Sequence, residues 1–157
     1  MSSAPRAEAP GRDAFAIFRP LTTRWADNDI YGHLNNVVYY ALFDTAVNGW
    51  LCDAGLLDVG RSPVIGLVVS SQCDYFSSVA FPDALEAGLR VDRVGRSSVT
   101  YGVGIFREDA SVAAAAGRFT HVYVTAVDHR PTPLSDAMRA ALQSLDVADG
   151  NRSAQSH

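Results

Sequence analysis

The spacing of hydrophobic and polar residues changes twice along the chain. Residues 15–23 mix apolar and polar positions in a short stretch, which predicts a first strand. Residues 37–55 then run without proline and are apolar on most sides, which predicts a helix of about five turns surrounded by the rest of the protein. Asn35 and Asn36 stand before this helix as good N-terminal caps, and Gly55 is a favourable C-terminal stop.

After the helix the pattern becomes that of a β-sheet. Four segments are rich in β-branched, aromatic or alternating residues and are joined by short turns. They are residues 64–76, 85–94, 97–107 and 112–127. Ser135 then caps a short helix that reaches about residue 145. Consecutive hairpins predict an antiparallel sheet with the long helix across one face, an α+β fold.

Both ends of the chain differ in composition from its middle. Residues 1–14 lack the apolar centre of a signal peptide, and we expect them to form a mobile N-terminal leader. Residues 147–157 are polar, and we expect a mobile C-terminal tail. The remaining residues, 15–146, are about the length of one ordinary domain, which we expect to fold as a single unit.

The composition excludes several classes of function. All 13 basic residues are arginine, so chemistry that requires a lysine amine is excluded. The net charge of -4 disfavours binding to nucleic acid or to an anionic membrane surface, and no apolar run is long enough to span a membrane. Cys52 and Cys73 have neither zinc-site nor redox-pair spacing. We expect buried free thiols and a cytoplasmic location.

The densest polar cluster stands between the first strand and the long helix. It contains Asp27, Asp29 and Gly32, as a calcium loop would. The fifth and twelfth positions of such a loop would be Tyr31 and Val38, which cannot bind calcium through their side chains. A phosphatase that uses an aspartate pair would also need a lysine. Neither interpretation is therefore supported.

Three histidines are candidate zinc ligands. His33, His121 and His129 are far apart in the sequence, although the last two occupy one strand-like region. Their spacing does not support zinc binding, and we expect no metal site.

Residues 27–44, DNDIYGHLNNVVYYALFD, resemble the hot-dog-fold acyl-CoA thioesterases of the 4-hydroxybenzoyl-CoA thioesterase type. That family has an acidic pair, a glycine three residues on, an asparagine, and an aromatic residue just inside a long helix. The predicted order of elements also matches, as do the segments DRVGRSS and AAGRFTHVYV, so the resemblance runs from about residue 15 to 145. It implies an antiparallel five-stranded sheet wrapped around one long helix (βαββββ), with a short C-terminal helix.

The resemblance implies a role for the second aspartate of the pair. Asp29 would act either as the nucleophile or as the general base for water, and the sequence leaves both open. A backbone N–H at the start of the long helix, near Asn36, would polarise the thioester carbonyl. Asp27 is expected to brace the loop together with Arg24, and the side chains of the asparagine pair to act as helix caps.

Three neighbouring residues complete the expected site. Gly32 permits a tight backbone turn. His33 would orient the carbonyl or the substrate, or simply bond to the backbone. Tyr39 is a candidate for substrate contact as well as for packing.

Coenzyme A carries phosphates, and in this chain any cation that binds them must be an arginine. By resemblance, the turn between two central strands would face the nucleotide. The candidates there are Arg93, Arg96, Ser97 and Ser98, with solvated surface arginines as the alternative. Coenzyme A would be part of the substrate, and no separate cofactor is expected.

The expected function is hydrolysis of an acyl-CoA thioester to a carboxylic acid and CoA. One alternative is a hot-dog-fold hydratase or dehydratase, whose histidine follows the aspartate by about five residues; the spacing from Asp29 to His33 is one residue shorter. Another is a non-catalytic acyl-CoA-binding protein. A homodimer or homotetramer is expected because one helix covers one face of the sheet and the first strand offers an edge. The sequence does not specify whether the acyl group is aromatic, short or long.

Overall fold

The computed structural model describes residues 7–147 and contains one sheet with one long helix. The strands are β1 (Ile17–Leu21), β2 (Val64–Tyr75), β3 (Leu85–Val94), β4 (Ser98–Arg107) and β5 (Ala115–Thr125). The helices are α1 (Val38–Asp53) and α2 (Asp136–Leu142), and short 3-10 turns occupy Arg12–Ala14, Trp25–Asp27 and Gln143–Leu145. The predicted order of elements is confirmed.

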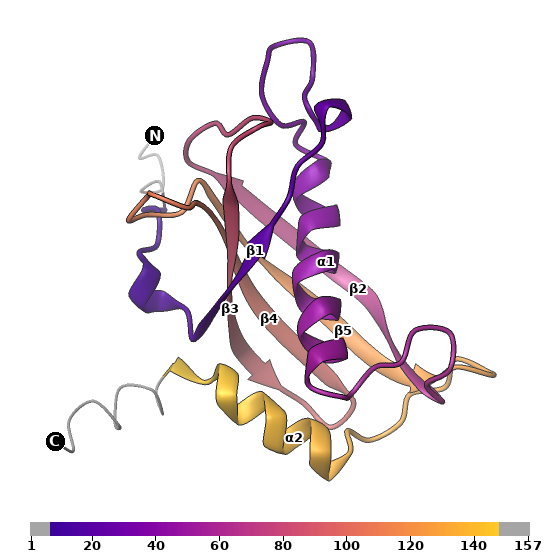
Figure 1. Cartoon of the computed structure of the whole chain (residues 1–157). Coiled ribbons are helices and arrows are strands. Elements are labelled where there is room, and N and C mark those ends of the chain that lie inside the picture. Colours follow the sequence, from indigo (N-terminus) through magenta and orange to yellow (C-terminus); the bar gives the residue numbers. More distant parts are fainter. Residues whose placement is uncertain (1–6, 148–157) are drawn as a thin grey trace, which may run out of the picture.

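All neighbouring strands are antiparallel, in the order β1-β3-β4-β5-β2. The helix α1 lies across one face of this sheet, and α2 lies at the end of the sheet where α1 finishes (Figure 1). The hot-dog arrangement that the sequence predicted is therefore confirmed.

The buried residues of α1 recur three and four positions apart along one side of the helix. They are Tyr39, Leu42, Phe43, Ala46, Val47, Trp50 and Leu51. This spacing gives one apolar stripe that packs on the sheet. Ala41 and Asp44, on other sides of the helix, are exposed. The prediction that the rest of the protein surrounds α1 on most sides is wrong for this chain. The apolar residues of α1 outside the stripe are small or lie near the ends of the helix, and they do not form a second buried side.

The start of α1 differs in detail from the prediction. The helix begins at Val38, and its N-cap position is Val37 rather than an asparagine. Asn35 still acts as a cap, because its carbonyl accepts from the Val38 N–H (3.0 Å) and its side-chain oxygen from the Val37 N–H (3.2 Å). The side chain of Asn36 makes no such bond, so the capping role expected for it is wrong.

Two other helix boundaries are confirmed. Gly55 has a φ of 74°, a left-handed conformation that suits glycine, and the Leu56 N–H donates to the Leu51 carbonyl at 2.9 Å. These features form a Schellman motif that closes α1. Ser135 caps α2, and its hydroxyl accepts from the Met138 N–H at 3.1 Å.

Residues 10–14 belong to the leader expected from the sequence, and in the structure they contact parts of the chain that are distant in sequence. Arg12 forms an ion pair with Glu86 at 2.9 Å and donates to the Ala110 carbonyl at 2.7 Å. These partners are far away in sequence, so local composition could not reveal them. Residues 1–6 and almost all of the expected tail lie outside the described residues.

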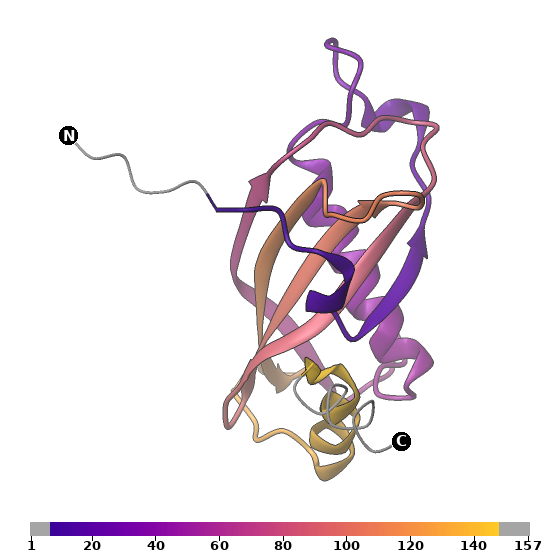
Figure 2. The ribbon, with the colours of Figure 1, turned by 90° about the vertical axis from the view of Figure 1, so that its left-hand side faces the viewer.

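The N-terminal segment crosses the outer face of the sheet, the face opposite α1 (Figure 2), and Phe15 packs on two glycines of that sheet. A Cβ atom at Gly88 would lie 2.7 Å from Phe15 Cγ, and one at Gly104 would lie 2.6 Å from Phe15 Cζ. The two glycines therefore leave the space that the ring occupies. Beside it, Phe106 is fully buried and makes an edge-to-face contact with Phe15 at 5.6 Å.

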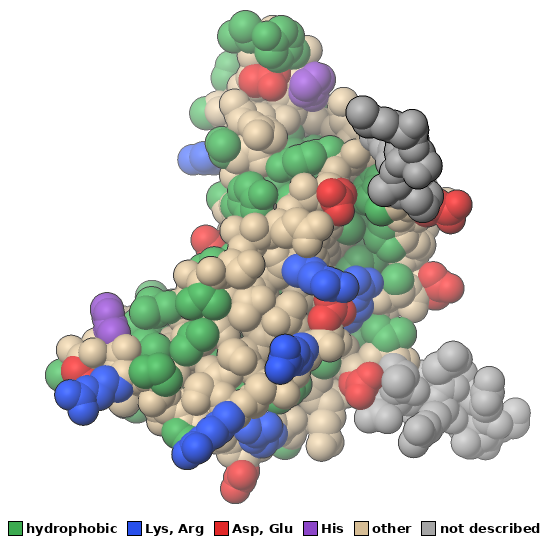
Figure 3. Space-filling view, turned by 180° about the vertical axis from the view of Figure 1, so that it is seen from behind, with side chains coloured by type: hydrophobic (Ala, Val, Ile, Leu, Met, Phe, Trp, Pro, Cys, Tyr) green, Lys and Arg blue, Asp and Glu red, His purple; other side chains and the backbone are tan. Residues whose placement is uncertain are grey.

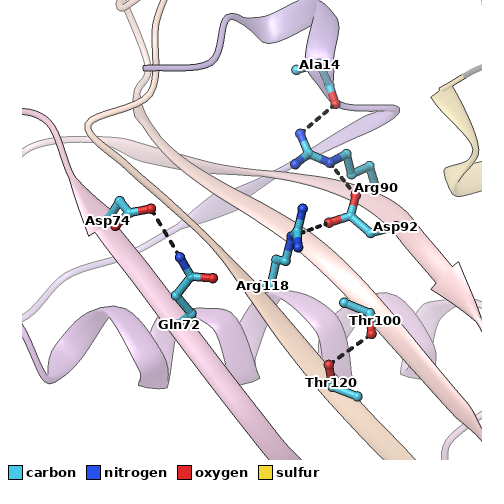
Figure 4. A network of polar contacts seen from close by, with 8 residues as sticks. All are labelled: Ala14, Gln72, Asp74, Arg90, Asp92, Thr100, Arg118 and Thr120. Atoms are coloured by element: carbon cyan, nitrogen blue, oxygen red, sulfur yellow. Dashed lines mark hydrogen bonds and ion pairs between the residues drawn. The ribbon is translucent and has the colours of Figure 1, made fainter. Parts of the chain in front are cut away.

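Charged and hydroxyl side chains also lie on the outer face. Asp92 joins two arginines, with Arg90 Nε at 2.7 Å and Arg118 Nε at 3.4 Å (Figure 4). Thr100 and Thr120 share a hydrogen bond of 3.0 Å between neighbouring strands. Figure 3 views this face, and arginine and acidic side chains lie close together on it. The main apolar core lies between the sheet and α1, and a smaller apolar cluster surrounds Phe15 and Phe106 on the outer face.

The two edges of the sheet are unequal. β1 has five residues and includes Pro20, whereas β2 has 12 residues. Val64, Val68 and Val69 of β2 are exposed. The first strand was expected to offer the edge for pairing, but β2 is the longer free edge within the described residues.

Two further observations concern the cysteines and the helices. Cys52 is exposed and Cys73 is half-buried, so the prediction of buried thiols is wrong. Cys52 lies outside the apolar stripe of α1, which explains its exposure. Within residues 7–147, no helix is both long enough and apolar enough to cross a membrane.

Candidate active site

The polar loop of residues 24–36 connects β1 to the start of α1 and protrudes at that end of the sheet (Figure 1). Its tip is closed by backbone hydrogen bonds from the Asp29 N–H to the His33 carbonyl (2.9 Å) and from the Gly32 N–H to the Asp29 carbonyl (3.1 Å). Gly32 has a φ of 84°. The tight turn expected at this glycine is confirmed.

Asp27 braces the base of the loop, as expected. Its carboxylate is 5% exposed and accepts hydrogen bonds from the Arg24 backbone N–H (2.8 Å), Nη2 (2.8 Å) and Nε (3.2 Å). Bonds from the guanidinium lower the pKa of Asp27 from its usual value, although burial opposes them. The Asp27 carbonyl also accepts from the Asn35 N–H at 3.0 Å, so the brace reaches the start of the helix.

Asp29 is held in place from two sides. Its Oδ1 accepts from the Tyr31 N–H at 2.8 Å, and its Oδ2 lies 3.7 Å from His33 Nδ1. The Tyr31 ring stacks on the His33 ring, with centroids 6.3 Å apart. The side chain of Asp29 is 19% exposed, so water can still reach the carboxylate.

Four of the predicted site residues border one open cavity of about 410 Å³. They are Asp29, His33, Asn36 and Tyr39, and Leu34 also lines it. The opposite wall is formed by Tyr75, Phe76, Ser77 and Ser78, at the end of β2 and just beyond it. These residues were not predicted to belong to the site, because no local signal in the sequence connects them with a loop some 40 positions away.

Tyr75 links the two walls. Its hydroxyl donates to the Asn36 carbonyl at 3.1 Å, and its ring meets that of Tyr39 edge-to-face at 5.0 Å. Burial raises the pKa of Tyr39 to about 12 and also raises that of Tyr75. Both phenols are therefore neutral near neutral pH, and they orient the start of α1 rather than supply charge.

The amide N–H of Asn36 makes no hydrogen bond to another described residue. It lies two residues before Val38, where α1 begins. The first turn of a helix has unpaired N–H groups and a partial positive charge. This end of the cavity can therefore stabilise a negative charge that develops on a bound carbonyl oxygen.

The candidates for binding the nucleotide lie elsewhere in the same chain. Arg93, Arg96, Ser97 and Ser98 belong to the β3–β4 turn, next to α2 and at the opposite end of the sheet from the Asp29 loop (Figure 1). Leu21 pairs with Leu85, and Arg93 is eight residues further along β3, or about 27 Å at the usual rise per residue. Arg93 and Arg96 therefore do not lie near Asp29 of their own chain.

The three histidines are also separated. His33 borders the cavity and His129 is exposed, whereas His121 is 1% exposed beneath α1. Burial lowers the pKa of His121 to about 4, so this side chain is neutral near neutral pH. Among residues 7–147, no three His, Cys, Asp or Glu side chains are grouped as a metal site requires.

The chain was compared with protein families and with known proteins. The model of the thioesterase-like superfamily matches residues 23–142. Among solved structures, the PA5185 protein of Pseudomonas aeruginosa strain PAO1 is 53% identical, with a TM-score of 0.86 over 88% of this chain and 97% of that one. YsmA of Bacillus subtilis (strain 168) is 26% identical over 89 residues, which span 57% of this chain and 60% of YsmA.

A more distant structure has the same fold. Slr0204, a 1,4-dihydroxy-2-naphthoyl-CoA thioesterase from Synechocystis, is 17% identical, with a TM-score of 0.72 over 82% of this chain and 96% of that one. The family match covers the polar loop, the long helix and all four strands that follow. On this evidence, the chain belongs to the thioesterase-like superfamily.

Proposed function

We propose that the protein hydrolyses an acyl-CoA thioester to a carboxylic acid and CoA. The observation that supports this most directly is the shared cavity, in which the Asp29 carboxylate and the start of α1 border one open space. A carboxylate and an unpaired backbone N–H, here that of Asn36, are the two elements that this acyl transfer would use. Slr0204, a thioesterase for an aromatic acyl-CoA, has the same fold.

In the proposed mechanism the carbonyl oxygen of the thioester points to the Asn36 N–H. Asp29 then acts in one of two ways. As a general base, it takes a proton from water, and the oxygen of that water attacks the carbonyl carbon. As a nucleophile, it attacks the carbon itself and forms an anhydride that water later hydrolyses. In both, the C–S bond breaks and the CoA sulfur leaves as a thiolate that takes up a proton.

The proposal includes a homodimer, formed by β2 of two copies. Antiparallel pairing of two identical strands is compatible with a two-fold axis and would cover the longer edge of the sheet. It would also bring the β3–β4 turn of one copy to the end of the sheet where the other copy carries Asp29. Arg93 and Arg96 of the second copy are then the proposed contacts for the phosphates of CoA.

The test is release of CoA from a panel of acyl-CoA thioesters, followed with a thiol reagent. Asp29→Asn removes the charge at nearly constant shape and is expected to lower kcat/KM more than about 100-fold. Asp109→Asn, an exposed carboxylate in the turn after β4, is the matched control and should retain full activity. A loss of less than about tenfold in the Asp29 variant would reject its assigned role.

Two further results bear on the same proposal. The mechanism needs no metal, so activity should survive dialysis against EDTA; activity that returned only with zinc or magnesium would contradict it. Binding of acyl-CoA without any turnover would instead favour the non-catalytic alternative.

A further inference from the structure

The last residue of β2, Tyr75, connects the edge of the sheet to the start of α1 (Figure 1). Its hydroxyl donates a hydrogen bond of 3.1 Å to the Asn36 carbonyl, although the two residues are 39 positions apart. The Tyr75 ring meets that of Tyr39 edge-to-face, so the side chain is held at its ring as well as at its hydroxyl. This link is a tertiary contact and not part of the turn that begins α1.

The backbone around Tyr75 is itself firmly held. Tyr75 pairs with Ala115 of β5, which is an interior strand of the sheet. The two N–H groups that follow, those of Phe76 and Ser77, donate to the Ala114 carbonyl at 2.8 and 3.1 Å. Tyr75 therefore provides a fixed point against which a less restrained segment can be oriented.

Asn36 and Val37 form such a segment. Both residues are exposed, and they lie between the polar loop and Val38, the first residue of α1. Asn36 is restrained through the peptide groups on its two sides. The group before it contains the Asn36 N–H and the Asn35 carbonyl, which accepts from the Val38 N–H at 3.0 Å. The group after it contains the Asn36 carbonyl, which accepts from Tyr75.

The second restraint limits how far the Asn36 N–H can turn. Each peptide group is planar, so the backbone at Asn36 rotates only about the two bonds to its Cα atom. While Tyr75 holds the carbonyl, a rotation that tilts the N–H also stretches the hydrogen bond to the phenol. Without that bond, the orientation of the N–H depends on the bond between Asn35 and Val38, within one short turn.

We infer that Tyr75 is a positioning residue for the proposed hydrolysis and that it acts by holding the Asn36 N–H towards the carbonyl oxygen of the bound thioester. This inference rests on the proposed function. Tyr75 does not need to touch the substrate in this role. A donor stabilises a developing oxyanion best when its direction is fixed beforehand, because reorientation during the reaction costs part of the stabilisation.

The protonation state of Tyr75 agrees with a role in orientation. Burial raises the pKa of Tyr75 well above its usual value, and the nearby Cys73 and Tyr40 side chains add to the shift. The phenol is therefore neutral near neutral pH and keeps its proton in the bond to Asn36. Loss of the hydroxyl should thus lower the rate of hydrolysis without changing its pH dependence.

Tyr75→Phe removes the hydroxyl and keeps the ring that contacts Tyr39. Tyr40→Phe is the matched control, because Tyr40 is a partly buried tyrosine of α1 near Tyr75. The Tyr40 hydroxyl makes no hydrogen bond to another described residue. For both variants kcat and KM are measured over a range of pH, with a thioester that the wild type hydrolyses and at a temperature well below the lower Tm.

Tyr75→Phe is expected to lower kcat about 10- to 50-fold, because the donor is still present but less well aligned. KM should change less than about threefold, since the bond to the oxyanion forms mainly in the transition state. The pH profile should keep its shape, and Tyr40→Phe should match the wild type in every parameter.

A second measurement reports on Asn36 without using activity. In protein isotope-labelled at asparagine nitrogen, the NMR signal of the Asn36 N–H is identified by its loss in Asn36→Ser. This signal should shift or broaden in Tyr75→Phe and stay in place in Tyr40→Phe. An unchanged signal in Tyr75→Phe would show that the phenol does not hold this N–H.

Several results would overturn the inference. They are a kcat of Tyr75→Phe within about threefold of wild type, an equal loss in Tyr40→Phe, and a decrease in Tm large enough to explain the lost activity. A rise in KM at constant kcat would identify a substrate contact instead, and a shifted pH profile would identify a proton transfer by the phenol. Either one also contradicts the positioning role.

Failure of this inference is distinguishable from failure of the proposed function. Wild-type protein that hydrolyses none of the thioesters refutes the function itself. An active wild type whose Tyr75→Phe variant keeps its kcat and its Asn36 signal refutes only the role of Tyr75.

Discussion

Asp27 and Asp29 are two residues apart in sequence but have different surroundings in the structure. Single substitutions at these positions can therefore distinguish the roles of the two carboxylates. Asp27→Asn keeps the shape of the side chain but removes its charge and places an NH₂ group towards the Arg24 guanidinium. The native carboxylate is 5% exposed and accepts three hydrogen bonds, two of them from that guanidinium. The variant therefore loses charge-assisted bonds between a buried carboxylate and an exposed guanidinium.

The expected cost can be estimated from those bonds. The Asn oxygen can still accept from the Arg24 backbone N–H, so the loss is that of the contacts to the guanidinium. A hydrogen bond to a charged group contributes about 2 kcal/mol, which we expect as the decrease in the free energy of unfolding. For a chain of this length that corresponds to a Tm lower by about 4–8 °C. Activity should fall less than in Asp29→Asn, because Asp27 acts by holding the loop.

Urea unfolding at several pH values is the assay. The pKa of Asp27 is lowered in the folded state, so its contribution is present above the pKa of the unfolded chain and is lost as pH falls through the folded value. The difference between wild type and Asp27→Asn should thus be full near neutral pH and shrink below about pH 4. Asp109→Asn, with an exposed carboxylate, should unfold like wild type.

Three results would contradict this reasoning. The first is an Asp27→Asn protein as stable as wild type near neutral pH. The second is a stability difference that does not shrink in acid. The third is a greater loss of kcat/KM in Asp27→Asn than in Asp29→Asn, which would mean that the two carboxylates have exchanged roles.

Two other substitutions test the core and the edge of the sheet. Burial lowers the pKa of His121 from 6.5 to about 4 in the folded state. As the pH falls between these values, His121 is protonated in the unfolded chain but not in the folded protein, so the free energy of unfolding should decrease. His121→Phe should flatten this slope in urea unfolding, and an unchanged slope would exclude His121 as its source. Val69 is 60% exposed near the middle of β2, the edge that the proposed homodimer would cover. Val69→Glu should therefore give a monomer in sedimentation with little activity; a fully active monomer would refute the dimer.

The sequence predicted those features that depend on neighbours along the chain. Residues 85–94 alternate apolar and polar side chains, and β3 occupies the same residues. Gly55 and Ser135 set helix boundaries through bonds to residues within a few positions. The polar loop was recognisable for the same reason, since the contacts of Asp27 and Asp29 all lie within it or at its ends.

Features that depend on distant contacts were not predicted. Tyr75 completes the candidate site through a bond to Asn36, and nothing near it in the sequence indicates this. Arg12 anchors the N-terminal segment through residues more than 70 positions away, so the segment was taken for a mobile leader. The location of Arg93 at the far end of the sheet follows from strand register, which the alternation within one strand does not specify.

The packing of Phe15 on the outer face has a practical consequence for where the chain can be shortened. The family match begins at residue 23. If this residue were taken as the start of the domain, all residues before it would count as dispensable for folding. A chain that began at Ile17 would keep all five strands and still lose the ring that fills the space above Gly88 and Gly104. Phe106 would then be exposed to water on a face without a second helix. Truncated versions intended for crystallisation or fusion should therefore begin no later than residue 10, where the anchored segment starts.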